Sequence, residues 1–291
     1  MTKTDPTGAE GQETKTTRRA FLRGLAAAGI VGAVGTAAYG SLFERHDYEL
    51  TETDIFIRDL PEGFDGFRIA QVSDVHHSSL VSADDVRRVV EVANSARADL
   101  VALTGDYTTA SRKYVEPCAE LLSGLQAPHG VWAVLGNHDH NTGPALTRSA
   151  LARRGINVID NANTRLRRGG DELQLAGIGD WSWVDADWAR AFAGMDRARP
   201  TVLLSHQPSV LDRPETEGVS LILSGHTHGG QVSLPLVGAP VGHMDEFKYL
   251  RGRFSRGPTQ LYVTRGTGTI GLPLRLGARP EIAVLRLRRA V

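Results

Sequence analysis

The chain has 291 residues, of which 41% are hydrophobic and 23% are charged, and its 33 basic residues balance 33 acidic ones. This length can bury a substantial core, and the apolar content and balanced charge exclude an intrinsically disordered chain. Cys118 is the only cysteine, which excludes an intrachain disulfide and a cysteine-based zinc finger. Any metal ion would therefore have to be held by His, Asp, Glu or Asn.

The N-terminus has the pattern of a targeting segment. Residues 1–16 are polar and rich in Thr, Gly and Glu, as in a disordered leader. Arg18 and Arg19 precede Phe21 and an Ala- and Gly-rich apolar run over residues 24–40. This pattern resembles a twin-arginine signal, which directs the export of folded proteins, and an ordinary signal peptide or a membrane anchor are the alternatives. We expect an exported, extracytoplasmic protein that uses the twin-arginine export machinery, with residues 24–40 as an anchor if the leader is not cut.

Beyond a leader of residues 1–45, the sequence predicts one domain over residues 46–291. Without residues 1–40, 28 basic residues face 30 acidic ones, so we expect no nucleic-acid partner. Short apolar runs predict strands at 67–73, 99–104, 130–135, 156–159, 173–178, 201–204, 219–223, 261–263 and 282–287, with helices from 82 and near 115–125. This alternation is typical of a buried α/β sheet, and the strand-dense second half predicts a second sheet packed on the first.

Polar motifs follow the ends of five predicted strands. These are Ser73-Asp74-Val75-His76, Gly105-Asp106, Gly136-Asn137-His138-Asp139, Ser205-His206 and Gly225-His226-Thr227-His228. Because ligands of open α/β sheets bind where strand carboxyl ends open into loops, we expect these side chains at one rim. Nitrogen and oxygen donors of this kind bind Zn, Mn or Fe.

The spacing within these motifs suits a metal centre. Asp74 and His76 lie two residues apart, so both would leave the same face of an extended strand end, and His226 and His228 repeat this arrangement. Asp106 has enough lone pairs to bridge two cations. Each motif alone has an ordinary alternative, such as a turn, an Asn-rich loop tip or exposed loop histidines. Their ordered occurrence after successive hydrophobic strands favours a shared site.

In this order the motifs resemble the calcineurin-like metallophosphoesterase superfamily over residues 67–231, and the leader and size resemble its exported, single-domain bacterial branch. The resemblance implies a four-layer α/β/β/α fold, with two packed mixed sheets flanked by helices, as the catalytic domain. It also implies two divalent or trivalent ions, with Mn, Fe and Zn as candidates. The implied ligands of one ion are Asp74, His76, Asp106 and His228, and those of the other are Asp106, Asn137, His206 and His226. His138 would stand beside the ions as a catalytic group, oriented by Asp139.

The activity implied by this resemblance is metal-dependent hydrolysis of phosphodiester or pyrophosphate bonds by a hydroxide that bridges the ions. His138 would protonate the leaving group or stabilise its charge. Because the leader predicts export, we expect cell-envelope or lipid-linked substrates, such as phospholipid head groups, teichoic-type polymers or lipid-linked nucleotide sugars. The alternatives are a phosphomonoesterase that scavenges phosphate and a non-catalytic binding module that is stabilised by its metals.

Two departures from known motifs narrow the expected chemistry. Purple acid phosphatases of this superfamily carry a tyrosine three residues after the bridging aspartate, where this chain has Thr109. Tyr107 directly follows Asp106 and would point the other way, so we expect no tyrosinate–iron centre. The G-x-G-x-x-G pattern over residues 266–271 is followed by Pro273, which predicts a turn near the metal rim and not a nucleotide loop.

Two sets of side chains each have two possible structural interpretations. The three tryptophans of the DWSWVDADW segment either form an apolar wall for a leaving group or pack in the core. They are Trp181, Trp183 and Trp188. The C-terminal arginines either include a phosphate clamp or form a solvated basic face. They are Arg251, Arg253, Arg256, Arg265 and Arg275.

Overall fold

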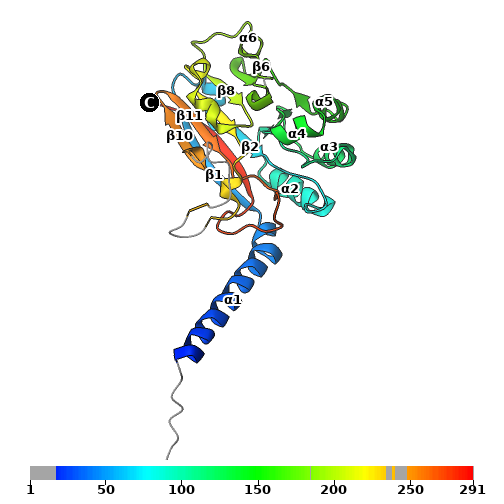
Figure 1. Ribbon diagram of the computed structural model, residues 1–291. Coiled ribbons are helices and arrows are strands. Elements are labelled where there is room, and N and C mark those ends of the chain that lie inside the picture. The colour runs from blue at the N-terminus through cyan, green and yellow to red at the C-terminus, as the bar shows by residue number, and fades with distance from the viewer. Residues whose placement is uncertain (1–17, 184, 234–237, 240–247, 291) are drawn as a thin grey trace, which may run out of the picture.

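The computed structural model describes residues 18–183, 185–233, 238–239 and 248–290 (Figure 1). Two six-stranded mixed sheets form its centre and helices lie outside them, so the predicted α/β class and four-layer architecture are confirmed. The leader expected to be disordered, residues 1–16, lies outside the described residues.

The first sheet carries the strands of the N-terminal half together with the last strand of the chain. Its order is β1 (Glu49–Ile57), β12 (Glu281–Arg289), β2 (Arg68–Val72), β3 (Leu100–Leu103), β4 (Val131–Ala133) and β5 (Asn157–Val158). Neighbours are parallel except β12 and β2, which run antiparallel. Therefore β1 and β12 run opposite to β2, β3 and β4.

The second sheet is built from the C-terminal half, as the strand density predicted. Its order is β10 (Gly252–Arg256), β11 (Thr259–Val263), β9 (Leu221–Ser224), β8 (Thr201–Leu204), β7 (Asp171–Gly177) and β6 (Ala162–Arg168). The inner pairs are parallel, and β10 and β6 each join by an antiparallel hairpin. Parallel inner strands buried on both faces explain the continuous apolar runs in the sequence.

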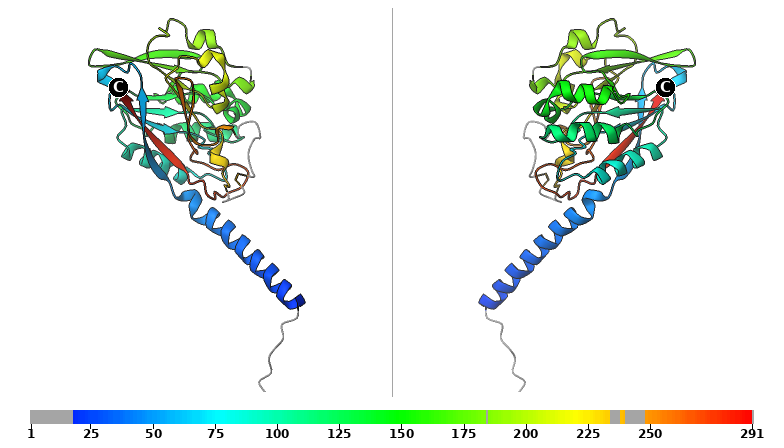
Figure 2. Two further views of the ribbon diagram at one scale, coloured as in Figure 1. Left: turned by 90° about the vertical axis from the view of Figure 1, so that its left-hand side faces the viewer. Right: turned by 90° about the vertical axis from the view of Figure 1, so that its right-hand side faces the viewer.

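Helices cover the outer face of the first sheet. They are α2 (Ala83–Ser95), α3 (Val115–Leu122) and α5 (Pro144–Ala152), and α3 and α5 pack side by side (Figure 2). The predicted capping box at the start of α2 is present, because Ser82 Oγ accepts the Asp85 N–H at 3.2 Å and Asp85 Oδ2 accepts the Ser82 N–H at 2.8 Å. Val86 and Val90 of α2 pack in the layer that this face buries.

Apolar side chains fill three layers between these elements. One layer lies between the helices and the first sheet, a second between the two sheets, and a third between the second sheet and α6 (Trp188–Ala191) with the short turn Pro208–Asp212. The middle layer contains Ile69, Leu100, Leu204 and Leu223 from both sheets, which fixes how the sheets lie against each other.

Three strands were not predicted from the sequence, and all three are edge strands. β1, β6 and β10 each end a sheet and leave much of their length exposed. Leu166 is the one buried side chain of β6. Such strands lack the continuous apolar run that marks a central strand, so their pairing partners and not their composition determine them.

Before the domain, α1 (Arg18–Leu42) projects away from it as a long helix (Figures 1 and 2). The segment Leu25–His46 is long and apolar enough to cross a membrane, and only 6% of its apolar window is buried by protein. The end of α1 rests on the domain, because Arg275 N donates to Gly40 O at 3.2 Å and Ser41 Oγ to Pro273 O at 2.8 Å. Glu44, just beyond α1, accepts the Ala278 N–H at 3.1 Å.

The strand directions place the carboxyl ends of β2, β3 and β4 at the edge of the sheet where β1 begins. β1 begins a few residues after α1, so these strand ends and the end of α1 share one edge of the domain. The end of β9 meets the end of β2 there, since His226 N donates to both carboxylate oxygens of Asp74 at 3.0 Å.

Candidate metal centre

The loops after five strands meet at this edge and bring together all seven side chains expected to bind metal. Asp74 and His76 follow β2, Asp106 follows β3, and Asn137 begins the short helix α4 (Asn137–Thr142) after β4. His206 follows β8, and His226 and His228 follow β9. These side chains form two groups, and Asp106 of the second group also lies close to the first.

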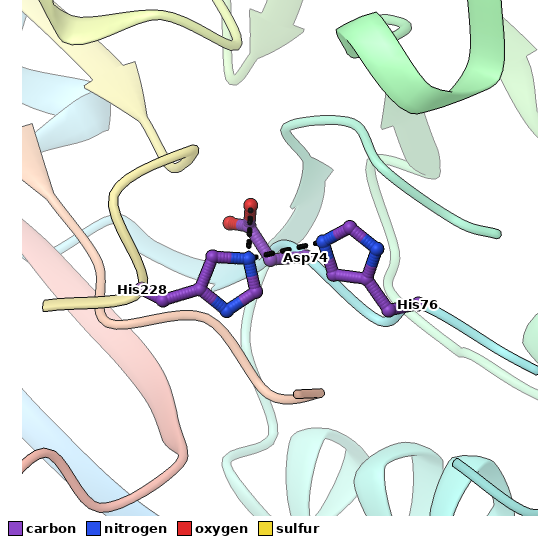
Figure 3. A group of neighbouring side chains, drawn as sticks. All are labelled: Asp74, His76 and His228. Carbon is purple, nitrogen blue, oxygen red and sulfur yellow. Dashed lines mark hydrogen bonds and ion pairs between the residues drawn. The ribbon is translucent and has the colours of Figure 1, made fainter. Parts of the chain in front are cut away.

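The first group consists of Asp74, His76 and His228, whose ligand atoms converge (Figure 3). The Nε2 atoms of His76 and His228 are 3.0 Å apart, and Asp74 Oδ1 lies 3.5 Å from His228 Nε2. All three side chains are buried. The two Nε2 atoms and the carboxylate oxygen point at one spot, where a cation would replace the contact between the two imidazoles.

The second group consists of Asp106, His206, His226 and Asn137. His206 Nε2 lies 3.2 Å from Asp106 Oδ2, 3.1 Å from Asn137 Oδ1 and 3.1 Å from His226 Nδ1. Asn137 and His226 are partly exposed, whereas the first group is buried. The second group is therefore the more accessible of the two to solvent.

Asp106 joins the two groups through one oxygen. Its Oδ2 lies 3.5 Å from His76 Nε2 and 3.2 Å from His206 Nε2. Its Oδ1 accepts the His138 N–H at 2.9 Å, which fixes the carboxylate with Oδ2 turned toward both groups. This is the geometry that a bridging ligand requires.

The donor set fits two first-row divalent cations. Ligands about 2.0–2.1 Å from an ion, at octahedral or tetrahedral angles, lie about 3.0–3.4 Å apart, which matches the separations within each group. His206 Nδ1 lies 2.8 Å from Thr104 O, so this nitrogen carries the proton and leaves Nε2 free for a metal. Nitrogen and carboxylate donors together suit Mn, Fe or Zn.

The backbone at these ligands is unusual. Asp74, His76, Asp106, His226 and His228 all have φ between 52° and 73°, in the left-handed region that non-glycine residues seldom adopt. The expectation that Asp74 and His76 extend from a straight strand end is therefore wrong, and tight left-handed turns aim them at the centre. Such strain is concentrated at functional sites and costs on the order of 1–3 kcal/mol per residue.

Two glycines make room for the ligands. A Cβ atom on Gly136 would overlap the Asp106 carboxylate, and a Cβ on Gly225 would overlap Ser73 and the Asp74 carboxylate. The motif glycines at these two positions are thus required by close backbone approach to the ligand side chains.

Burial and mutual charge shift the titration of the centre. Burial lowers the pKa of His76 to about 3 and that of His228 well below its usual value, so both imidazoles are neutral near pH 7. Burial raises the pKa of Asp74 to about 6. Burial would lower the pKa of His206, but the carboxylates of Asp106 and Asp74 outweigh it and raise the value to about 10. The same carboxylate charge that raises the pKa of His206 would attract a cation to this spot.

His138 lies beside the first group, with its ring edge-on to His76 at a centroid distance of 4.9 Å. Its Nδ1 is 2.7 Å from Thr109 O, so Nδ1 donates to that carbonyl and Nε2 is left for proton transfer. The side chain is partly exposed. This arrangement suits a group that delivers a proton to a ligand at the centre.

The expectation that Asp139 orients His138 is wrong. The Asp139 carboxylate accepts three backbone N–H groups, from Asp106 at 2.8 Å, Gly136 at 3.0 Å and Tyr107 at 3.0 Å. It fixes the loop that carries Asp106, whereas a backbone carbonyl orients His138. A carbonyl has no sequence signature, so this partner could not be read from the motif.

Asp180 is a strand-end acid that the sequence analysis missed. It follows β7 next to β8, it is buried, and its charge acts to raise the pKa of His206. Ser182 donates to its Oδ1 from both N and Oγ, and Oδ2 has no hydrogen-bond partner among the described residues. Its position after a predicted strand, in Gly179-Asp180, is the signal that could have identified it.

Tyr107 and the glycine-rich turn behave as expected. The Tyr107 hydroxyl is buried and donates to Val134 O at 2.7 Å, away from the centre. In the 266–271 turn, Thr267 N donates to Ser73 O and Gly268 N to Asp74 O, at 3.0 and 2.7 Å. The turn therefore packs against the first ligand segment.

The structure shows the contacts of the tryptophans and arginines for which the sequence left two interpretations. Trp188 packs against the third apolar layer and stacks on Phe192, whereas Trp181 and Trp183 are exposed and Trp183 stacks on His140. Arg275 is fully buried and donates to backbone carbonyls, including Gly268 O at 2.6 Å. The contacts of the other four arginines are also with protein groups. They are Arg251 with Gly277, Arg253 with Gln260, Arg256 with Leu211, and Arg265 with Glu49 and Glu281.

Comparisons with known proteins agree with this geometry. The model of the calcineurin-like phosphoesterase family matches residues 67–230. The chain is 35% identical to the uncharacterized metallophosphoesterase YkuE of Bacillus subtilis (strain 168), over 94% of this chain and 98% of that protein. It is 31% identical to the phosphodiesterase YaeI of Escherichia coli (strain K12), over 76% and 82% of the two chains. A transmembrane protein with a metallophosphoesterase domain from Danio rerio is 31% identical, over 90% of this chain and 62% of its own. The chain therefore belongs to the calcineurin-like phosphoesterase family of metal-dependent hydrolases.

Proposed function

We propose that this protein hydrolyses phosphodiester or pyrophosphate bonds of cell-envelope or lipid-linked substrates on the outer side of the cytoplasmic membrane. The observation that carries the proposal is the position of the ligand cluster at the edge of the domain where α1 ends. An anchor in that helix would hold the centre next to the membrane. Phosphate groups of membrane-bound substrates lie at that surface.

The charges around α1 support this orientation. A span needs about 20 predominantly apolar residues, and Leu25–His46 is 22 residues long with charged side chains only in its last three positions. Arg18, Arg19 and Arg23 precede this segment. Basic residues flanking a span stay on the cytoplasmic side, so the catalytic domain would lie outside. The paired arginines also fit export by the twin-arginine machinery, which carries folded proteins.

The residues of the chain divide the chemistry among them. When two divalent ions are bound, they supply Lewis-acid charge and activate water for attack on phosphorus. Asp106 would hold both ions, with Asp74, His76 and His228 on one and Asn137, His206 and His226 on the other. The carboxylates of Asp74 and Asp106 offset only about half of the roughly +4 charge of two ions, which leaves a positive site for a phosphate anion. His138 would donate its Nε2 proton to the leaving oxygen.

A paired assay tests the bond type. We expect purified protein to release p-nitrophenol faster from bis(p-nitrophenyl) phosphate than from p-nitrophenyl phosphate, and chelator to abolish both activities until Mn²⁺ or Zn²⁺ is restored. The relative named as a phosphodiesterase supports the diester. Asp106→Asn should lose metal and activity, while exposed Asp84→Asn should keep both.

Other outcomes of the same assay assign other functions. A preference for the monoester would favour a phosphomonoesterase that scavenges phosphate. Two bound metal ions without activity on either compound would favour a non-catalytic module.

Export is tested separately. In a bacterial host with the twin-arginine system, Arg18→Lys with Arg19→Lys should leave the protein in the cytoplasm, and the parent should reach the envelope fraction. Equal export of both would contradict the twin-arginine route and leave the assay on diesters unaffected.

A further inference from the structure

We propose that the catalytic domain makes a second membrane contact, through a loop of residues 270–274 and the adjoining end of α1. The partner is the lipid bilayer, and the inference rests on the proposed anchoring by α1. The contact would fix the orientation of the domain so that the metal centre faces the membrane surface. We call the exposed apolar residues Leu42, Phe43 and Leu272 the apolar tip.

The apolar tip is continuous with the membrane-spanning segment. Leu42 is the last residue of α1 and Phe43 follows it, with Phe43 65% exposed. The 270–274 loop lies directly against this end, because Ser41 Oγ and Arg45 Nη1 both donate to Pro273 O. Leu272, which directly precedes Pro273, is 51% exposed. Exposed apolar side chains adjoining an apolar helix have one natural partner, which is the lipid that surrounds the helix.

Hydrogen bonds hold the backbone of the loop in place, so the exposed position of Leu272 is fixed by the fold. Buried Gln231 donates its Nε2 to Ile270 O at 2.9 Å and to Leu272 O at 3.2 Å, and its Oε1 accepts the Ile270 N–H at 2.9 Å. Gln231 follows the ligand His228 by three residues. The same amide group therefore connects the loop to a ligand-bearing turn.

The flanking groups suit the membrane–water interface. Tyr39 stacks on Phe43 at a centroid distance of 6.1 Å, and aromatic side chains are enriched at this depth. Arg45 donates to Pro273 O in the loop, Arg251 donates to Gly277 O just beyond it, and neither is ion-paired with a carboxylate in the part of the chain that the structure describes. Such arginines can meet lipid phosphates while the apolar tip enters the acyl region.

The segments on either side of the 270–274 loop contact ligands of the metal centre. The segment that ends in the loop begins at Gly266, which packs on the Asp74 side chain, and Gly268 N donates to Asp74 O at 2.7 Å. After the loop, Arg275 donates to Gly40 O and also reaches His228, with Nη2 3.4 Å from Nδ1. A tip seated in the bilayer would place the metal centre at the level of phosphate head groups.

Because α1 alone would hold the chain on a membrane, the test must report depth and not binding. The full chain is placed in nanodiscs of phosphatidylcholine and phosphatidylglycerol, with an NBD fluorophore on Leu272→Cys. The natural Cys118 is buried and does not compete for the label. Phe56→Cys is the matched control, since Phe56 is 53% exposed but lies near the end of β1, at the opposite edge of the sheet.

We expect lipids with brominated acyl chains to quench NBD at position 272 severalfold more than at position 56. NBD at Phe43→Cys should be quenched like position 272. Equal, weak quenching at 272 and 56 would overturn the proposal, as would shielding of position 272 that depends on protein concentration and not on brominated lipid, which indicates a second copy. Circular dichroism and metal content equal to the parent verify that each labelled chain is folded.

A fourth label separates this inference from the anchoring on which it rests. Val31→Cys lies on the exposed side of α1. Quenching at 31 without quenching at 272 refutes the second contact alone, whereas no quenching at 31 refutes the anchor. Hydrolysis of soluble bis(p-nitrophenyl) phosphate tests the proposed activity independently of either result.

Discussion

Replacing Asp139 with asparagine distinguishes two roles for this buried acid. It could orient His138, or it could fix the loop that carries Asp106. The structure gives it three backbone N–H groups to accept, two at Oδ2 from Asp106 and Gly136 and one at Oδ1 from Tyr107. Burial and the Asp106 carboxylate raise the pKa of Asp139 to about 8, and the donated N–H groups oppose this shift. None of the three partners can accept a proton, so the carboxylate, which predominates above this pKa, is the form that satisfies all of them, and the variant is compared with the parent above pH 8.

The magnitude follows from counting these bonds. An asparagine can keep its oxygen at the Oδ2 position and retain two bonds, which turns its NH₂ group against the Tyr107 N–H. The Tyr107 N–H and the new NH₂ group would then both lack an acceptor, and each such buried donor costs about 1–3 kcal/mol. Since a domain is stable by about 5–15 kcal/mol, the variant should still fold. The same loop carries Asp106, so we also expect about a 10–100-fold loss of metal affinity, as for other partners that hold metal ligands.

The assay is urea unfolding in chelator, followed by metal titration. Chelator is needed because bound metal would stabilise the folded state and mask the difference. Exposed Asp84→Asn serves as the matched control and should unfold like the parent. If Asp139→Asn kept the parental stability and metal affinity but lost turnover, Asp139 would act on His138 and our account of the loop would be refuted.

Three further predictions use the same protein. His138→Ala should lower turnover by about 10²–10⁴ while metal content by mass spectrometry stays at the parental level, and loss of metal would make His138 a ligand. Gly136→Ala should lose metal because the new Cβ overlaps the Asp106 carboxylate, whereas Gly35→Ala, which meets open space, should not. Burial would raise the pKa of Glu281, but Arg265 and hydrogen bonds outweigh it and hold the pKa below its usual 4.5. Its stabilising effect is therefore present above pH 4.5 and lost as pH falls through the lower folded value, so the difference in unfolding free energy between parent and Glu281→Gln should shrink in acid.

The ligand-bearing strands could be predicted because their burial shows in the sequence. β2, β3, β8 and β9 are central strands with continuous apolar runs, and each is followed at once by its polar motif. The edge strands β1, β6 and β10 could not be found in this way, because one-sided exposure leaves them polar. The insertion of β12 between β1 and β2 depends on pairing across more than 200 residues, which no local pattern encodes.

The identity of the site residues was easier to predict than their geometry. Asp74 and His76 were expected on an extended strand, yet both adopt left-handed backbone conformations. Asp139 was expected at His138, yet the Thr109 carbonyl takes that position. In each case the side-chain chemistry is visible in the sequence, whereas the turn conformation and the backbone partner depend on the packing of neighbouring loops.

The junction between α1 and the domain contains no flexible spacer, since residues 40, 41 and 44 are all bonded to the segment 273–278. A catalytic domain on a flexible linker can move through the solution above the membrane. A domain attached rigidly to its membrane helix would instead diffuse with the helix, at a fixed height above the bilayer. Its search for substrate would then be two-dimensional. Phosphoester bonds at a height above the bilayer different from that of the metal centre would not reach it, whatever their concentration.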